Sequence, residues 1–117
     1  MADVSLKLVV LRTPQVDRLR AFYRALGVEL AEERHGNGPL HFAGKVGGVV
    51  LEVYPLPAGA TADTTTRLGF AVQRLATVVQ ALQDAGGVVT GGPQQSAWGL
   101  RAVVRDPDGR AVELYEA

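Results

Sequence analysis

An internal repeat constrains the fold of this chain more than any other feature of its sequence. When Leu11 is placed on Phe70, the later apolar positions and the glycines that follow them also coincide. A repeat of this kind is one supersecondary unit, which must bury its apolar face against a neighbour. The sequence therefore predicts two similar units. The further aligned pairs are Val16 with Leu75, Leu19 with Val78, Tyr23 with Leu82, and Gly27 with Gly86.

Each half of the chain has the pattern β-α-β-β-β. Apolar residues at helical spacing predict a helix over 16–26, with Thr13 as its N-cap and Gly27 as the glycine that ends it. The same spacing predicts a second helix over 75–85. Short apolar runs between turn residues predict the strands. These strands are expected at 6–11, 28–33, 40–43 and 49–54, and then at 68–72, 88–90, 100–104 and 111–115.

These elements predict an α+β fold in which two tandem βαβββ units form curved mixed sheets. Because a helix covers one face of each sheet, we expect the helices on the outer face and a concave cavity on the other. The length of 117 residues fits one domain, residues 1–117. Within it, unit one is expected at about 5–55, a connector at 56–66 and unit two at about 67–117.

Composition excludes several classes of function. The chain has 12 basic and 12 acidic residues, so a broad basic surface for nucleic acid or for an anionic membrane is not expected. It has no cysteine, which excludes disulfides, thiolate catalysis and cysteine-based zinc sites. No apolar run approaches the about 20 residues that span a bilayer, and the first residues lack the features of a signal peptide. We therefore expect a cytoplasmic protein.

Two carboxylates occupy equivalent places in the two units. Period-two alternation places Glu52 and Glu113 on the concave faces of their strands. A carboxylate within a strand is unfavourable by propensity, and the simplest interpretation is a solvated residue on a half-exposed sheet. Because the repeat places both at the same position, we favour a functional role. The same concave faces are predicted to carry Leu8, Val10, Arg12, Val50, Tyr54, Arg67, Gly69, Ala71, Ala111 and Tyr115.

Short motifs along the whole chain carry a family resemblance. They are Leu8-Val-Val-Leu-Arg12 with Asp17, Ala21-Phe22-Tyr23, Leu26-Gly27, Trp98-Gly99, Arg105-Asp-Pro-Asp-Gly109 and Val112-Glu113-Leu114. In this order the motifs resemble those of the glyoxalase/bleomycin-resistance/extradiol-dioxygenase superfamily, also called the vicinal oxygen chelate (VOC) superfamily. The resemblance implies the fold given above. It also implies a homodimer, with cavities built from units of both subunits.

The resemblance further implies a metal site with four ligands, usually His or Gln, Glu, His and Glu. The matching positions are Leu8, Glu52, Arg67 and Glu113. A leucine has no ligand atom and an arginine is a permanent cation, so two of the four ligands remain. Our hypothesis is that the Arg67 guanidinium replaces the ion by bonding the carboxylates that face the cavity.

Histidine offers an alternative route to a metal site. His35 and His41 lie in or beside the strands of the first half, and His41 flanks Phe42, so only one of that pair faces inward. In this alternative, His41 would join Glu52 and Glu113 as a ligand of a divalent metal ion. A lone histidine near a Gly-Pro turn is more often a surface residue or a hydrogen-bonded one.

The first functional hypothesis is a binding module with no cofactor. It would hold a small aromatic or amphipathic compound between Trp98, Tyr54, Tyr115, Arg67 and Arg12. The resemblance to the drug-sequestering bleomycin-resistance branch, which works without a metal, supports it.

The second hypothesis is an enzyme: a metal-dependent lyase, isomerase or dioxygenase of the glyoxalase type. One of Glu52 and Glu113 would ligate the metal ion, and the other would act as a base near the substrate. A third interpretation is a subunit whose cavity is vestigial, because a fold alone does not establish function.

Overall fold

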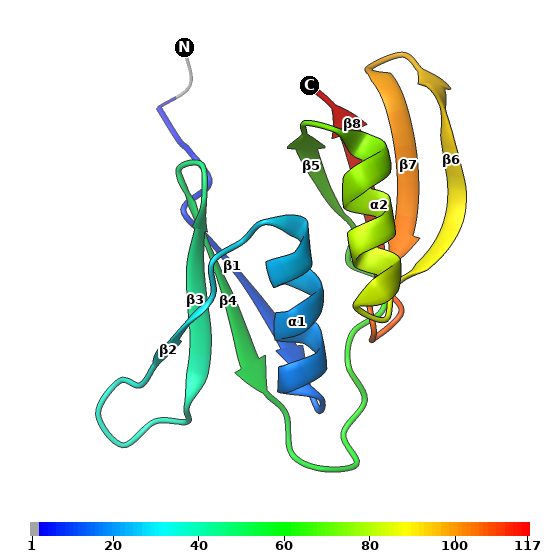
Figure 1. Ribbon diagram of the computed structural model, residues 1–117. Coiled ribbons are helices and arrows are strands. Elements are labelled where there is room, and N and C mark those ends of the chain that lie inside the picture. The colour runs from blue at the N-terminus through cyan, green and yellow to red at the C-terminus, as the bar shows by residue number, and fades with distance from the viewer. Residues whose placement is uncertain (1–2) are drawn as a thin grey trace.

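The structure is a computed structural model that describes residues 3–117 (Figure 1). The first two residues of the expected domain lie outside this range. Two βαβββ units follow one another, as the repeat predicts. The elements of the first unit are β1 (Leu8–Thr13), α1 (Val16–Leu26), β2 (Ala31–Glu33), β3 (His41–Val46) and β4 (Val49–Pro55). Those of the second are β5 (Leu68–Val72), α2 (Leu75–Asp84), β6 (Val88–Ser96), β7 (Gly99–Arg105) and β8 (Ala111–Glu116).

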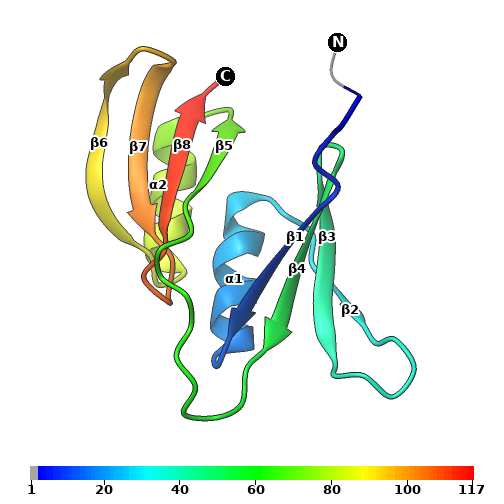
Figure 2. The same ribbon diagram turned by 180° about the vertical axis from the view of Figure 1, so that it is seen from behind.

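Each unit forms its own four-stranded mixed sheet. The strand orders are β1-β4-β3-β2 and β5-β8-β7-β6, and Figure 2 shows the two sheets side by side. In each sheet the first and last strands of the unit run parallel, and the remaining pairs are antiparallel. Val10 pairs with Glu52 in the first sheet, and Gly69 pairs with Glu113 in the second. The two carboxylates therefore occupy equivalent positions, as the sequence predicts.

The start of α1 differs from the prediction. Thr13 is not the N-cap, because β1 extends to Thr13, where it pairs with Pro55. The N-cap residue is Gln15, whose backbone amide donates a hydrogen bond to the Thr13 hydroxyl (3.0 Å). The end of α1 agrees with the prediction: Gly27 has φ +116°, a left-handed conformation that favours glycine.

Strands β2 and β6 differ most in length from the prediction. Only residues 31–33 of the expected strand 28–33 pair with a neighbour, although Val28 and Leu30 are buried in the core. Strand β6 is longer than expected and continues past Gly92 and Pro93, with two irregularities of register. It is an edge strand, where bulges and proline are tolerated because one side of the strand needs no partner.

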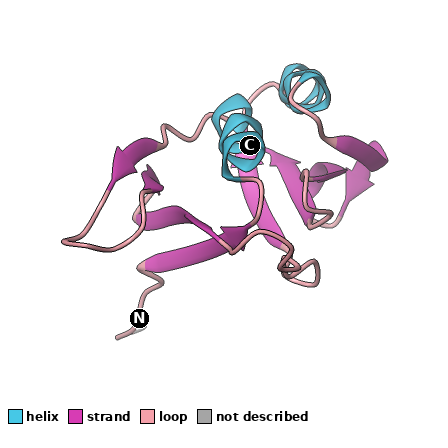
Figure 3. Cartoon of the chain, turned by 90° about the horizontal axis from the view of Figure 1, so that it is seen from below, coloured by secondary structure: helices cyan, strands magenta, loops and turns pink. Residues whose placement is uncertain are grey.

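Both units share one hydrophobic core. The two helices contact each other and lie on the same side of the two sheets, as Figure 3 shows. The Tyr23 ring of α1 lies 6.3 Å from the Phe70 ring of β5, measured between centroids. At Gly87 a β-carbon would come within 2.8 Å of the Phe22 ring. Strand residues on the faces opposite the predicted concave ones are in or against this core: Val9, Leu11, Leu51, Val53, Leu68, Phe70, Val72, Val112 and Leu114.

A buried polar cluster at the β7–β8 hairpin also joins the units. Arg110 is 2% exposed, and its guanidinium binds Asp106 (3.3 Å) and Asp108 (2.9 Å). It also donates to the backbone carbonyl of Arg12 in β1 (2.8 Å). The Tyr23 hydroxyl donates to Asp106 (3.0 Å), and burial, followed by the charge of Asp106, raises the pKa of Tyr23 well above its usual value. In the sequence, residues 105–109 serve only as a family motif, which does not predict this cluster.

None of the helices within residues 3–117 is both long enough and apolar enough to cross a membrane.

Candidate functional site

The concave face of unit one carries a group of ionisable side chains on three adjacent strands. Glu33 of β2 and His41 of β3 are cross-strand partners, and Glu52 of β4 lies on the same face. The His41 Nε2 atom is 3.1 Å from Glu33 Oε1 and 3.9 Å from Glu52 Oε2. Sequence reasoning placed Glu52 on the cavity side and offered His41 as an alternative ligand, and the structure brings the two together.

His41 is held in one orientation. Its side chain is 1% exposed, and its ring stacks on Tyr54 with 3.9 Å between centroids and 11° between planes. Its Nδ1 atom lies 3.1 Å from the carbonyl oxygen of Pro39. A carbonyl oxygen only accepts hydrogen bonds, so Nδ1 carries a proton and donates it. The Nε2 atom points toward the two carboxylates and lies within hydrogen-bond distance of Glu33 Oε1, which accepts the bond.

His35 completes this group. Its Nε2 atom lies 2.8 Å from the same Glu33 oxygen that His41 approaches. One ligand atom from each of Glu33, His35, His41 and Glu52 lies within 4.8 Å of all the others. The hydrogen bond with His41 is the main cause that lowers the pKa of Glu33. Sequence reasoning did not connect His35 or Glu33 with this group, because their contact depends on the β2–β3 turn.

The concave face of unit two has a carboxylate at the same place but different partners. The guanidinium of Arg67 is 2.5 Å from one oxygen of Glu113, and that of Arg101 is 2.9 Å from the other. The Tyr115 hydroxyl also donates to Glu113 (2.6 Å). The bonds from Tyr115 and Arg101, followed by that from Arg67, lower the pKa of Glu113 to about 2. Glu113 is therefore ionised and neutralised at neutral pH.

Arg101 is a residue that sequence reasoning missed. Ala43 pairs with Glu52 and Val103 pairs with Glu113, so His41 and Arg101 each lie two residues before equivalent positions. At equivalent positions, unit one therefore has a histidine and unit two has an arginine. Extending the repeat alignment to the third strand of each unit would have shown this equivalence.

The exposed aromatic side chains of unit two line a shallow pocket. Trp98, in the turn between β6 and β7, is 77% exposed, and its ring centroid is 5.4 Å from that of Tyr115. A cavity of about 280 Å³ is bounded by Ser96, Ala97, Trp98, Arg101 and Tyr115. In unit one, the Arg12 guanidinium lies 5.3 Å from the centroid of the Tyr54 ring.

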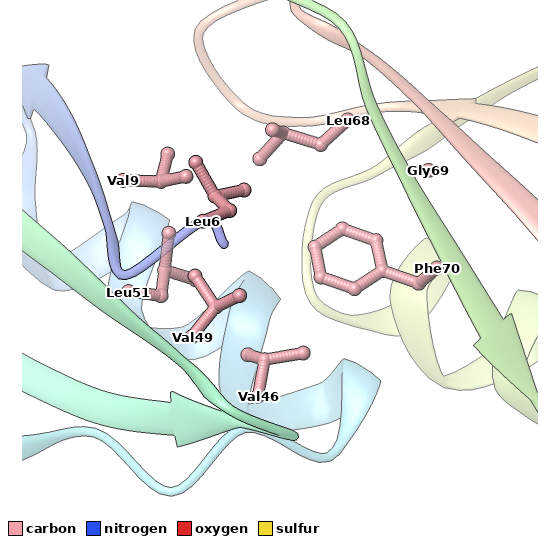
Figure 4. A pocket seen from close by; sticks show the side chains of 8 residues that line it. All are labelled: Leu6, Val9, Val46, Val49, Leu51, Leu68, Gly69 and Phe70. Carbon is pink, nitrogen blue, oxygen red and sulfur yellow. The ribbon is translucent and has the colours of Figure 1, made fainter. Parts of the chain in front are cut away.

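A second pocket lies between the two units, on the helix side of both sheets (Figure 4). Its volume is about 130 Å³ and its walls are apolar. In Figure 4, Val9 and Leu51 of the first sheet face Leu68 and Phe70 of the second, with Leu6 between them. Since Glu52 and Glu113 project from the opposite faces, this pocket is separate from both charged groups.

The sequence model of the Glyoxalase/Bleomycin resistance protein/Dioxygenase superfamily matches residues 5–114. The chain belongs to this superfamily. An uncharacterized protein of Mycolicibacterium smegmatis is 30% identical over 115 residues, which are 98% of this chain and 96% of that protein. The family resemblance drawn from the sequence motifs is thereby confirmed.

Solved structures of other proteins have the same fold. A glyoxalase/bleomycin resistance protein/dioxygenase family enzyme from Burkholderia phytofirmans superposes with a TM-score of 0.75 at 17% identity, over 97% of this chain and 98% of that one. TnmS3, an antibiotic binding protein from a Streptomyces species, superposes with a TM-score of 0.71 at 24% identity, over 99% and 98%. These likenesses confirm the predicted α+β fold with two mixed sheets.

The metal site expected for this superfamily does not fit the residues of this chain. Leu8 offers no donor atom, and Arg67 at the matching position of unit two is a cation bonded to Glu113. Both oxygens of Glu113 already bind guanidinium groups. A metal ion at this position would have to displace two permanent cations. The residues that can ligate a metal lie instead on β2, β3 and β4 of unit one and in the β2–β3 turn.

Proposed function

We propose that this superfamily member binds a small, planar, anionic compound on the concave face of unit two, without a metal ion at Glu113. The observation that carries this proposal is the exposed Trp98 ring, which borders a pocket with Tyr115 and Arg101. A tryptophan that is 77% exposed leaves a large apolar area in water. A flat ligand that stacks on it would remove this area from water.

The charges around the pocket favour an anion. Glu113 is one negative charge in contact with two guanidinium groups, those of Arg67 and Arg101. The group therefore has a net positive charge, and the Arg67 side chain is 58% exposed, within reach of a ligand. A planar guanidinium pairs with carboxylate or sulfonate groups through two parallel hydrogen bonds. TnmS3, with the same fold, is an antibiotic binding protein, which is consistent with a role in binding small molecules.

We infer that the cavity is completed by a second copy of the chain. Strands β1 and β5 are edge strands of their sheets; the segment before β1 exposes Val4 and Leu6, and β1 itself begins with the exposed Leu8. An exposed strand edge with apolar side chains is a surface that pairs with another chain. We therefore expect a homodimer in sedimentation equilibrium at micromolar concentration. A monomer at all concentrations up to those of the ligand titration below would contradict this inference.

The proposal is tested by the fluorescence of Trp98, the single tryptophan of the chain. Anthraquinone-2-sulfonate is added to the protein, and the quenching of Trp98 fluorescence is measured. The same titration with the cationic analogue 2-(aminomethyl)anthraquinone is the charge control. We expect saturable quenching by the sulfonate and weaker binding of the amine. Calorimetry with Trp98→Ala is expected to show an affinity lowered roughly tenfold, as the loss of one aromatic contact predicts.

Arginine variants locate the bound anion. Arg101→Gln is expected to weaken binding of the sulfonate by about tenfold or more, because it removes a charge at the pocket wall. Arg24→Gln, an exposed arginine on α1, serves as the matched control and is expected to leave the affinity unchanged. Absence of saturation up to about 1 mM, or equal losses in both arginine variants, would overturn the proposal.

A further inference from the structure

We propose that unit one binds a divalent transition-metal ion of the zinc type through Glu33, His35, His41 and Glu52. Of these four residues, only Glu52 is at a position where the superfamily places a metal ligand. The inference does not depend on the ligand proposed above, because the group lies on the sheet of the other unit. Among the described residues, this is the one place where histidine and carboxylate side chains gather within reach of a single ion.

The distances suit a small ion. Zinc in proteins takes nitrogen and oxygen ligands at about 2.0–2.2 Å in a tetrahedron, which places ligand atoms about 3.3–3.6 Å apart. The nearest pairs here are His35 with Glu33 at 2.8 Å, His41 with Glu33 at 3.1 Å and His41 with Glu52 at 3.9 Å. All four ligand atoms lie within 4.8 Å of one another. Small movements of side chains therefore produce the tetrahedral arrangement.

His41 is preorganised as a metal ligand. Its Nδ1 proton is donated to the Pro39 carbonyl, and its ring is stacked on Tyr54. Histidines that bind metals usually donate their other ring proton to a carbonyl or carboxylate, which fixes the tautomer and orients the ring. The Nε2 atom consequently points toward Glu33 and Glu52, and a metal ion would take the place of its proton, while the ring itself is 1% exposed.

The strand register explains why these residues converge. Glu33 and His41 are paired across β2 and β3, and Glu52 lies opposite Ala43, two residues along β3 from His41. Ala31 and Ala43 are also paired, so the position directly opposite Glu52 carries only a small side chain. His35 reaches the group from the β2–β3 turn, where its side chain is 68% exposed and leaves an open side for an ion to enter.

The electrostatics of the group favour a cation. Two carboxylates and two imidazoles meet here, and both histidines approach the same oxygen of Glu33. A divalent ion placed between them would neutralise both carboxylates and accept the lone pairs of both rings. In unit two the guanidinium groups of Arg67 and Arg101 supply the positive charge for Glu113. The metal ion would supply the corresponding charge for Glu52.

The test uses Zn²⁺ and Co²⁺ with the full chain. The protein has no cysteine, and its two histidines are both in this group, so a histidine-ligated metal has only this place to bind. Calorimetry with Zn²⁺ after removal of metals by EDTA is expected to show one ion per chain. Addition of Co²⁺ is expected to produce the visible absorption bands of a tetrahedral ion with nitrogen and oxygen ligands.

Variants then distinguish this site from the superfamily position. His35→Ala changes an exposed turn residue and Glu52→Gln keeps the side-chain shape, so both are expected to fold and to weaken Zn²⁺ binding by roughly tenfold or more. Glu113→Gln is the matched control, and it is expected to retain full binding. Loss of binding in Glu113→Gln with retention in His35→Ala would overturn the proposal, as would a wild-type chain that binds no Zn²⁺ and gives no Co²⁺ bands.

Discussion

Replacement of Arg110 by methionine is expected to lower the free energy of unfolding by about 3–5 kcal/mol. The guanidinium neutralises Asp106 and Asp108, both of which are almost fully buried. Methionine fills similar space but leaves two carboxylates without a counter-ion, and it removes the bond to the Arg12 carbonyl of the other unit. Urea unfolding followed by circular dichroism measures the change.

Arg105→Met is the control for this experiment. Arg105 is an exposed residue of the same hairpin, and its guanidinium donates to the backbone carbonyl of Gly109 (2.7 Å). Because the side chain is in water, the same substitution there is expected to cost less than about 1 kcal/mol. If Arg110→Met costs no more than Arg105→Met, the buried cluster does not hold the hairpin to unit one.

Phe22→Ala is expected to lower the free energy of unfolding by about 3–5 kcal/mol, because it removes the ring of a fully buried residue. Phe22 projects from α1 of unit one toward Gly87, at the start of β6 in unit two. The loss therefore weakens the core that both units share. We expect one cooperative unfolding transition in the wild type and in the variant, with coincident changes in far-UV circular dichroism and Trp98 fluorescence.

Val88→Ala provides the comparison for Phe22→Ala. Val88 follows Gly87 directly but is 61% exposed, so its truncation is expected to change the stability by about 0.5 kcal/mol or less. Separate transitions for the two probes in the wild type would contradict a common core. A cost for Phe22→Ala as small as that of Val88→Ala would contradict it as well.

Much of the fold was predictable because the repeat indicates each element twice, once in each unit. The helix over 16–26 and the strand over 68–72 have the predicted bounds, since apolar spacing and flanking turn residues agree there. The strand over 28–33 was too long in the prediction because Val28 and Leu30 are apolar for reasons of core packing, without strand pairing. Apolarity alone does not distinguish these two cases.

The site was predictable only in part. Alternation along a strand identifies the sheet face on which Glu52 and Glu113 lie, because that face depends only on local backbone geometry. It does not identify partners on neighbouring strands. The approach of His35 to Glu33 depends on the β2–β3 turn, and the bond from Arg101 to Glu113 depends on the β7–β8 register. The sequence hypothesis gave Arg67 the role of replacing a metal ion, and the structure adds Arg101 as a second guanidinium on Glu113.

We propose that the ligand binds at the arginine pair of unit two, independently of any metal ion. The most direct test is the Trp98 fluorescence titration with anthraquinone-2-sulfonate, repeated on protein freed of metals by EDTA and dialysis. We predict saturable quenching with an affinity within about twofold of the untreated protein, because Arg67 and Arg101 supply the charge that holds the anion. Binding that disappears on metal removal, returns with a divalent ion and is abolished by Glu113→Gln would contradict this account.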